Sequence, residues 1–229
     1  MKIRINDCYF RRVVHILSKE FSLISEFLRE LRDKDIQQDR ARFRKNIERI
    51  GQIAAYEISK KMEHDLHFTN TPLGIAKVKK MKEQPILATI LRAGLPLQQG
   101  LNHMFDQGDL AYISAYRKHT DENDYSKFEI KLEYVATPDI NDRILIISDP
   151  MLATGQSLVQ TYEAFMKKGS PKKVYLVGVI GSKQGVDFVT KSIPNTDLWI
   201  GVVDETLDKN GYIVPGLGDA GDLSFGTKV

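Results

Sequence analysis

Residues 146–157 combine an acidic side chain, two hydroxyl side chains and a glycine in a pattern that could bind a phosphate group. An apolar run typical of a buried strand ends at Asp149, and Thr154, Gly155 and Ser157 follow where a helix would begin. Backbone N–H groups at a helix N-terminus favour an anion. The segment lacks the Gly-Lys-Ser/Thr of a Walker loop. An ordinary strand-to-helix turn capped by Thr154 or Ser157 is the alternative interpretation.

Two arginines stand at the ends of other apolar runs and could bind an anionic group. Arg92 follows the apolar residues 86–91, and Arg117 closes the run at 110–117. A guanidinium group matches phosphate oxygens in pairs, and ligands of open α/β sheets bind at the carboxyl ends of the strands. From the residues alone, a structural ion pair for Arg92 and a solvent-exposed loop charge for Arg117 are the alternatives.

The glycine-rich segment 211–226 could approach a ligand closely with its backbone. Glycine permits positive φ and a close approach of the main chain, and we expect this use at Gly216, Gly218 and Gly221. An ordinary turn around the hairpin signal Asn210-Gly211 is the alternative.

The elements that must position these residues follow from the spacing of apolar side chains. Apolar residues recur at helical spacing in 21–31 and again in 43–58, which predicts two amphipathic helices. From about residue 85, short apolar strands alternate with helices, which is typical of a single α/β domain. We predict strands at 86–91, 110–117, 127–136, 143–148, 173–180 and 197–203, and helices at about 95–105, 155–168 and 185–192. The strict alternation in 127–136 indicates a half-buried strand antiparallel to its neighbour.

Composition limits the classes of protein that the chain can be. The chain has 229 residues, of which 42% are hydrophobic and 28% charged, and this suits a globular domain. We expect no membrane span, because no run of 18 apolar residues occurs. The single Cys8, with no visible secretory signal, predicts a cytoplasmic protein without disulfides. A net charge of +3 does not suggest a nucleic-acid partner.

Two further segments give weaker indications. Residues 118–126 lack an aliphatic anchor and predict a mobile loop, a candidate lid. His64 and His67 lie three residues apart at the end of the second predicted helix. We expect them to be solvent-exposed rather than metal ligands.

Four segments together resemble the uracil phosphoribosyltransferase family, a branch of the type I phosphoribosyltransferases. Residues 149–155, Asp-Pro-Met-Leu-Ala-Thr-Gly, resemble its signature for 5-phospho-α-D-ribose 1-diphosphate (PRPP). Residues 90–95 are similar to its diphosphate-side loop, and Ala115-Tyr116-Arg117 to the start of its flexible loop. Residues 211–227 are similar to its C-terminal uracil loop. The segments occur in the family's order and cover the chain from roughly residue 20 to its end.

The resemblance implies an α/β fold with a central, mostly parallel sheet flanked by helices. It also implies an N-terminal helical segment and a small β-hairpin arm. We expect one phosphoribosyltransferase domain over residues 1–229, with a helical part at 1–65 and an α/β core at 85–229. The core would carry the flexible loop at 117–127 and the uracil loop at 211–226.

The implied reaction converts uracil and PRPP to UMP and diphosphate, a step of pyrimidine salvage. The catalytic residues would be Asp149, Arg92 and Asp219. The PRPP-binding residues would be Arg92, Arg117, Asp149, Pro150, Met151, Leu152, Ala153, Thr154, Gly155, Gln156, Ser157 and Asp219. The uracil-binding residues would be Ile213, Gly218, Asp219 and Ala220.

The resemblance also implies partners. Mg²⁺ would arrive with the diphosphate and its waters, with no direct protein ligand. We expect a homodimer or a higher oligomer, and GTP is a candidate effector because it activates some relatives. The alternative hypothesis is a non-catalytic regulator on the same fold that binds a nucleotide, with RNA as a further ligand.

The chain departs from the family pattern at three places. Gln156 stands where a second glycine is usual, and its side chain either points outward or alters the phosphate pocket. The flexible-loop sequence at 117–123 differs from the usual run, and Leu223-Ser224 replaces a commonly basic position. These differences bear on rate and regulation more than on the reaction.

Overall fold

A central eight-stranded sheet organises the chain in a computed structural model that describes residues 13–119 and 128–228. For 115–119 and 128–132 the description is of the backbone alone. The strands of the sheet are β1 (Val13–Ile16), β4 (Ile86–Leu91), β5 (Asp109–His119), β6 (Phe128–Ala136), β7 (Ile144–Ser148), β8 (Met151–Leu152), β9 (Lys173–Ser182) and β10 (Thr196–Asp204). Their order is β1-β10-β9-β7-β4-β5-β6, and β8 pairs with β9. All pairs are parallel except β5–β6, which is antiparallel.

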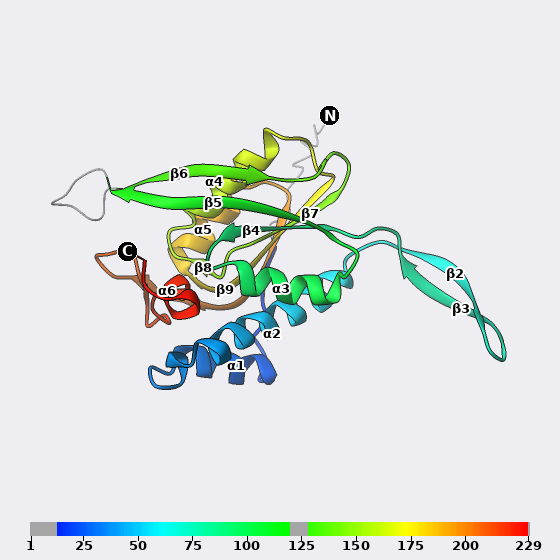
Figure 1. Cartoon of the computed structure of the whole chain (residues 1–229), viewed down its shortest axis with the longest axis horizontal. Helices are drawn as coiled ribbons and strands as arrows, with labels where there is room; N and C mark the ends of the chain where they lie inside the picture. The colour runs from blue at the N-terminus through cyan, green and yellow to red at the C-terminus, as the bar shows by residue number, and fades with distance from the viewer. Residues whose placement is uncertain (1–12, 120–127, 229) are drawn as a thin grey trace, which may run out of the picture.

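Helices cover both faces of this sheet, as Figure 1 shows. The helices are α1 (Leu23–Arg32), η1 (Ile36–Gln38), α2 (Arg40–Ser59), α3 (Leu95–Met104), α4 (Gln156–Met166), α5 (Lys183–Ser192) and α6 (Ala220–Phe225). One apolar core lies between the sheet and α1, α2 and α3, and a second lies on the face covered by α4 and α5. Burial on both faces explains the continuous apolar runs in strands such as β7, whose five residues are all buried.

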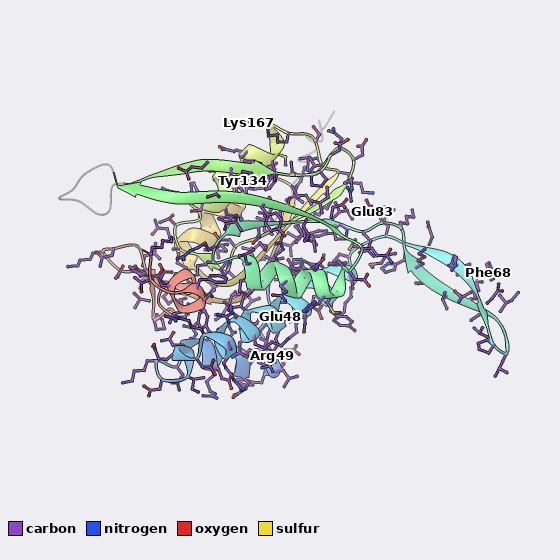
Figure 2. All side chains as sticks on the ribbon, in the orientation of Figure 1. Glu48, Arg49, Phe68, Glu83, Tyr134 and Lys167 are labelled. Atoms are coloured by element: carbon purple, nitrogen blue, oxygen red, sulfur yellow. The ribbon has the colours of Figure 1, made fainter. Side chains whose placement is uncertain are left out.

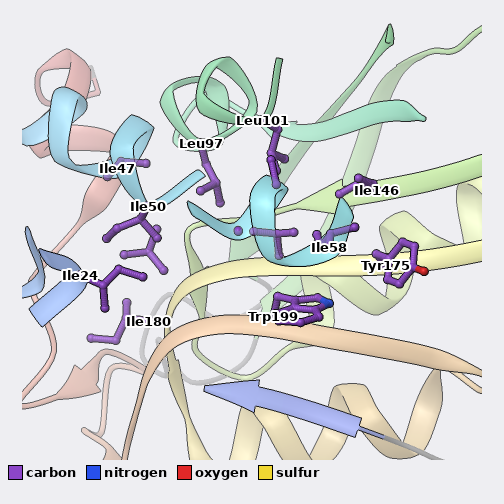
Figure 3. Packing of buried hydrophobic residues seen from close by; sticks show 14 of the residues in the cluster. Ile24, Ile47, Ile50, Ile58, Leu97, Leu101, Ile146, Tyr175, Ile180 and Trp199 are labelled. Atoms are coloured by element: carbon purple, nitrogen blue, oxygen red, sulfur yellow. The ribbon is translucent and has the colours of Figure 1, made fainter. Parts of the chain in front are cut away.

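The first core joins the N-terminal helices to the sheet. Figure 3 shows Ile47, Ile50 and Ile58 of α2 packed between α3 and the strands that carry Tyr175 and Trp199. Their recurrence at helical spacing explains why α2 presents one apolar face to the sheet. The N-terminal helices are therefore part of the domain core.

A long hairpin of β2 (His64–Thr71) and β3 (Gly74–Met81) projects away from the rest of the molecule (Figure 1). Its strands pair with each other in a separate two-stranded sheet. The predicted hairpin arm is thus confirmed and located. The prediction of a helical part over 1–65 is wrong at two places, because Val13–Ile16 is an edge strand of the main sheet and His64 begins β2.

The chain ends in a compact C-terminal segment that lies beside α2. A short hairpin of β11 (Thr206–Leu207) and β12 (Ile213–Val214) follows β10, as the Asn210-Gly211 signal predicts. The turn after β12 leads into α6. The predicted uracil loop at 211–226 therefore contains a strand and a helix besides its turns.

The remaining sequence predictions hold closely. The predicted strands at 86–91, 127–136 and 143–148 match β4, β6 and β7 to within a residue, and β6 is antiparallel to β5 as expected. The fold class, an α/β domain with a mostly parallel sheet, is confirmed. None of the helices in the described part of the chain is long and apolar enough to span a membrane.

Candidate active site

The candidate site lies at the carboxyl ends of two neighbouring parallel strands. β4 and β7 pair directly, with Thr89 opposite Ser148. Arg92 follows the end of β4 and Asp149 follows the end of β7, so both leave the same edge of the sheet. This arrangement brings to one sheet edge two of the residues that the family resemblance assigns to PRPP binding.

Main-chain hydrogen bonds hold the segment after Asp149 against β9. The carbonyl of Pro150 accepts the N–H groups of Val179 at 3.1 Å and Ile180 at 3.0 Å. The Asp149 carboxylate accepts the N–H of Met151 at 3.3 Å. The Ser182 hydroxyl donates to the carbonyl of Ala153 at 2.6 Å. The segment at 149–153 is therefore a fixed continuation of the sheet rather than a loose loop.

Gly155 makes the turn into α4 possible. Its φ is +78°, and a side chain there would place Cβ 2.8 Å from the carbonyl oxygen of Gly185. The positive φ and the lack of space for a Cβ atom both require glycine at this position. The N-cap of α4 is Gly155, so the alternative of a cap by Thr154 or Ser157 is wrong. The Thr154 hydroxyl accepts the N–H of Gln156 at 3.4 Å.

Gln156, the first departure from the family pattern, is exposed at the first turn of α4. The side chain is in solvent at the same helix N-terminus that would bind the phosphate, so its effect on the phosphate pocket stays a prediction. The helix N-terminus and the hydroxyls of Thr154 and Ser157 still stand together at the carboxyl end of β7. The local requirements for an anion site are present there.

Arg92 links the end of β4 to the C-terminal segment. Its Nη2 lies 3.4 Å from Asp222 Oδ1 and 3.4 Å from the carbonyl oxygen of Gly226. The ion pair foreseen as the structural alternative for Arg92 therefore exists. Both contacts are long, and the side chain is 40% exposed. Within the described residues its buried Nε has no hydrogen-bond partner, and the exposed part of the guanidinium can donate to a further ligand.

The predicted uracil residues occupy both sides of the C-terminal turn. Ile213 and Ala220 are buried, whereas Gly218 and Asp219 are exposed. The backbone φ is +63° at Gly216 and +89° at Gly218, as the sequence predicts. The expectation of positive φ at Gly221 is wrong, because Gly221 lies in the first turn of α6 with helical backbone.

Asp219 has a structural partner that the sequence analysis missed. Its Oδ1 accepts the N–H groups of Gly221 at 2.8 Å and Asp222 at 2.9 Å, which makes Asp219 the N-cap of α6. Aspartate is a preferred N-cap residue, so the sequence signal was present but was assigned wholly to ligand binding. Both bonds go to Oδ1, which leaves Oδ2 outside the cap.

Side chains of the helical layer hold the C-terminal segment by its backbone. Arg44 of α2 donates to the carbonyl of Ser224 at 2.6 Å. The amide nitrogen of Gln37 in η1 donates to the carbonyl of Leu217 at 2.8 Å. Arg32, at the end of α1, contacts both Asp204 and Gly216. Sequence analysis assigned no role to these residues, and it missed Asp204, the polar residue that ends the apolar run of β10.

A pocket of about 340 Å³ lies between this segment and the helical layer. Gly218 and Asp219 line it from the C-terminal side, and Gln37, Gln38 and Arg40 line it from η1 and α2. Two of the predicted uracil residues therefore border open space. Asp149 and Arg92 do not line this pocket.

Other predicted site features lie outside the described residues or outside the site. Arg117 falls in β5, which continues to His119, but its side chain and residues 120–127 of the predicted flexible loop are outside the described residues. His64 and His67 lie in the hairpin arm, not at a helix end. Among residues 13–119 and 128–228, no three His, Cys, Asp or Glu side chains gather as metal ligands.

Comparison with known proteins identifies the family. The family model described as uracil phosphoribosyltransferase matches residues 19–227. The chain belongs to the uracil phosphoribosyltransferase family. A uracil phosphoribosyltransferase from Porphyromonas gingivalis is 50% identical over 218 residues, which cover 95% of this chain and 99% of that protein.

More distant relatives agree with this family membership. A uracil phosphoribosyltransferase from Pyrococcus furiosus is 36% identical over 209 residues, covering 90% of this chain and 87% of that protein. A solved structure of a protein from Aquifex aeolicus has a TM-score of 0.81 and 28% identity, and the match covers 95% of this chain and all of that chain. The likeness therefore extends over nearly the whole fold, including the C-terminal segment.

Proposed function

We propose that this chain transfers the phosphoribosyl group of PRPP to uracil, forming UMP and diphosphate in pyrimidine salvage. The observation that carries the proposal is the family match over residues 19–227. The convergence of Arg92, Asp149 and the C-terminal segment supports it, because three motifs distant in the sequence meet near one sheet edge. Such an edge is where ligands of open α/β sheets bind.

The arrangement suits the three parts of PRPP. The 5′-phosphate would bind the turn at 151–157, where backbone N–H groups, hydroxyls and the α4 N-terminus favour an anion. Asp149 would accept hydrogen bonds from the ribose hydroxyls or stabilise positive charge that develops on the ribose carbon. Arg92, together with Arg117, would neutralise the diphosphate as it leaves.

The base would be recognised mainly by backbone groups of the C-terminal segment. Positive φ at Gly218 turns the main chain next to Asp219 and Ala220, where uracil would present O2, N3 and O4. Backbone donors and acceptors that match this edge leave the amino group of cytosine unpaired, which disfavours that base. Nucleophilic attack by uracil N1 forms the bond to the ribose carbon as the bond to diphosphate breaks.

We further propose that PRPP binds as its magnesium complex. Mg²⁺ keeps much of its water and is usually bound through one or two carboxylates and the phosphates of a substrate. Phosphate oxygens and water would therefore supply most of its ligands. The residues around the site, with the Asp149 carboxylate at its edge, are compatible with this arrangement. When bound, the ion would offset charge on the departing diphosphate.

The deciding experiment is conversion of radiolabelled uracil to UMP with PRPP and Mg²⁺. Cytosine, orotate and hypoxanthine serve as parallel substrates, and a second set of reactions contains GTP to test the proposed effector. Turnover of uracil alone is the expected result. Binding of PRPP or UMP without turnover of any base would refute the enzyme and favour the non-catalytic regulator.

The hairpin arm supports the proposal that the chain works as a homo-oligomer. Leu66, Phe68 and Ile75 share one face of the arm and are 55%, 63% and 72% exposed. Figure 2 shows Phe68 on the arm, far from the main sheet. A two-stranded hairpin alone is marginally stable in water, and exposed apolar clusters mark interaction sites. A second copy of the chain would cover this face.

Sedimentation velocity tests the oligomer directly. We expect the parent chain to sediment as a dimer or larger species and Phe68→Glu to shift it towards the monomer. Thr69→Glu, on the opposite face of the same strand, is the matched control and should leave the assembly intact. A parent chain that sediments as a monomer at the concentrations used in the assay would refute the proposal.

A further inference from the structure

We propose that Arg32 and Asp204 are positioning residues for the uracil-binding turn and act through the backbone of Gly216. Neither side chain is among the predicted substrate contacts. The inference rests on the proposed role of residues 213–220 in binding uracil. It assigns a purpose to an ion pair that joins the end of α1 to the end of β10.

The geometry connects three segments that are far apart in the sequence. Arg32 Nη2 donates to Asp204 Oδ1 at 2.7 Å, and Nη1 donates to Asp204 Oδ2 at 2.9 Å. The same Nη1 donates to the carbonyl of Gly216 at 3.1 Å, and Asp204 Oδ2 accepts the N–H of Gly216 at 2.9 Å. The pair therefore holds both the donor and the acceptor of one residue in the turn.

Hydrogen bonds to the backbone of Gly216 fix the conformation of a tight turn. The φ of Gly216 is +63°, and a side chain there would place Cβ 2.0 Å from the carbonyl oxygen of Ile213. The turn is therefore folded back tightly on Ile213, and Gly218 follows two residues later. A rotation of the Gly216 peptide groups would move Ile213 and Gly218, which lie on either side of it and are both proposed uracil contacts.

The Arg32–Asp204 ion pair is largely buried and stays charged at neutral pH. The side chains of Arg32 and Asp204 are 25% and 8% exposed. Burial alone would raise the pKa of Asp204, but hydrogen bonds from Arg32 and from the Gly216 N–H outweigh it and hold this pKa below its usual value. Asp204 therefore stays ionised at neutral pH. A bidentate guanidinium–carboxylate pair also fixes orientation, which a single lysine nitrogen cannot do.

A second ion pair in the helical layer supplies a matched control. Arg42 of α2 donates to Glu30 of α1 through Nε at 2.8 Å and through Nη2 at 2.5 Å. Glu30 is as buried as Asp204, with a side chain that is 8% exposed. This pair has the same bidentate chemistry and the same helix, α1, but among the described residues its side-chain hydrogen bonds stay within α1 and α2. Its loss reports on the stability of the helical layer alone.

The experiment compares Michaelis constants for the two substrates in full-length variants. We expect Arg32→Lys and Asp204→Asn to raise the KM for uracil about tenfold, equivalent to about 1.4 kcal/mol, and to leave the KM for PRPP within about twofold. Glu30→Gln should leave both Michaelis constants unchanged. Calorimetric binding of PRPP shows that each variant is folded. If a single variant is insoluble, the double variant Arg32→Gln with Asp204→Asn replaces it, because it leaves no unpaired buried charge.

Two outcomes would overturn the inference. Unchanged KM for uracil in Arg32→Lys and Asp204→Asn would show that the pair does not position the turn. Equal increases in both Michaelis constants, shared by Glu30→Gln, would show a general loss of stability. Gly218→Ala separates this inference from the proposed function, because its Cβ would lie 3.6 Å from Leu223 Cδ1, an ordinary contact, and only the φ of +89° is strained. If Gly218→Ala also leaves the KM for uracil unchanged, the uracil turn itself is wrongly assigned.

Discussion

Asp219 offers a test that separates catalysis from local folding. Its carboxylate caps α6 through Oδ1 and is also predicted to contact PRPP and uracil. Replacement by alanine removes both functions at once. Replacement by asparagine keeps an oxygen that can accept the N–H groups of Gly221 and Asp222, because asparagine and aspartate are similar N-caps. The two variants therefore differ in the cap, while both lack the negative charge.

The structure allows the two contributions to be estimated. Loss of an N-cap costs about 1 kcal/mol, which lowers the population of folded α6 relative to its unfolded form about fivefold. Loss of a preorganised charged group at a reacting centre costs about 100-fold or more in kcat. We therefore expect Asp219→Asn to lose about 100-fold in kcat with an unchanged melting temperature. Asp219→Ala should lose a further factor of at most about five, reached only if the shortened cap leaves α6 mostly unfolded.

The assay combines steady-state kinetics with hydrogen exchange at the amides of Gly221 and Asp222. Faster exchange in Asp219→Ala, but not in Asp219→Asn, would confirm that the cap is lost in alanine alone. A kcat/KM within twofold of the parent chain in Asp219→Asn would refute the reasoning. Asp219 would then be a capping residue, and Arg92 and Asp149 would remain as the predicted catalytic residues.

Three further predictions follow from local geometry. Gly155→Ala should raise the Kd for PRPP about tenfold or more, measured by calorimetry, because φ of +78° costs a non-glycine residue about 1–2 kcal/mol. Arg92→Ala should lower kcat/KM for PRPP at least about 100-fold without a lower melting temperature, since its contacts to the C-terminal segment are long. Hydrogen bonds from Arg42 and Asn46 lower the pKa of Glu30 from 4.5 to about 2. The free energy of unfolding in urea should therefore fall between pH 4.5 and 2 more steeply in the parent chain than in Glu30→Gln.

The central sheet was predictable because its strands are buried on both faces. Continuous apolar runs that end just before Arg92 and Asp149 mark β4 and β7, and strict alternation marks β6 as a half-buried strand antiparallel to its neighbour. Positive φ at Gly216 and Gly218 was predictable as well, because only glycine adopts it readily, although the same reasoning failed at Gly221. These features depend on local sequence alone, which is why the site's edge could be located in advance.

The features that were missed depend on tertiary contacts. β1 has four residues, and only its pairing with β10 defines it as a strand. The hairpin arm has few buried residues, so no apolar pattern marks its boundaries. The anchor formed by Arg32 and Asp204 joins residues 172 positions apart. No pattern within a single segment of the sequence can show that these two residues meet.

The two departures from the family pattern that lie within the described residues, Gln156 and Leu223-Ser224, fall where the backbone makes contacts of its own. Gln156 is exposed, while Gly155 beside it keeps the positive φ that the turn requires. Ser224 is held by Arg44 through its carbonyl oxygen, a contact that any residue type could make. Leu223 packs against the core on one side and lines the pocket beside Gly218 on the other. A site built largely from main-chain groups tolerates such changes, so the glycines and their anchors should constrain its activity more than these side chains do.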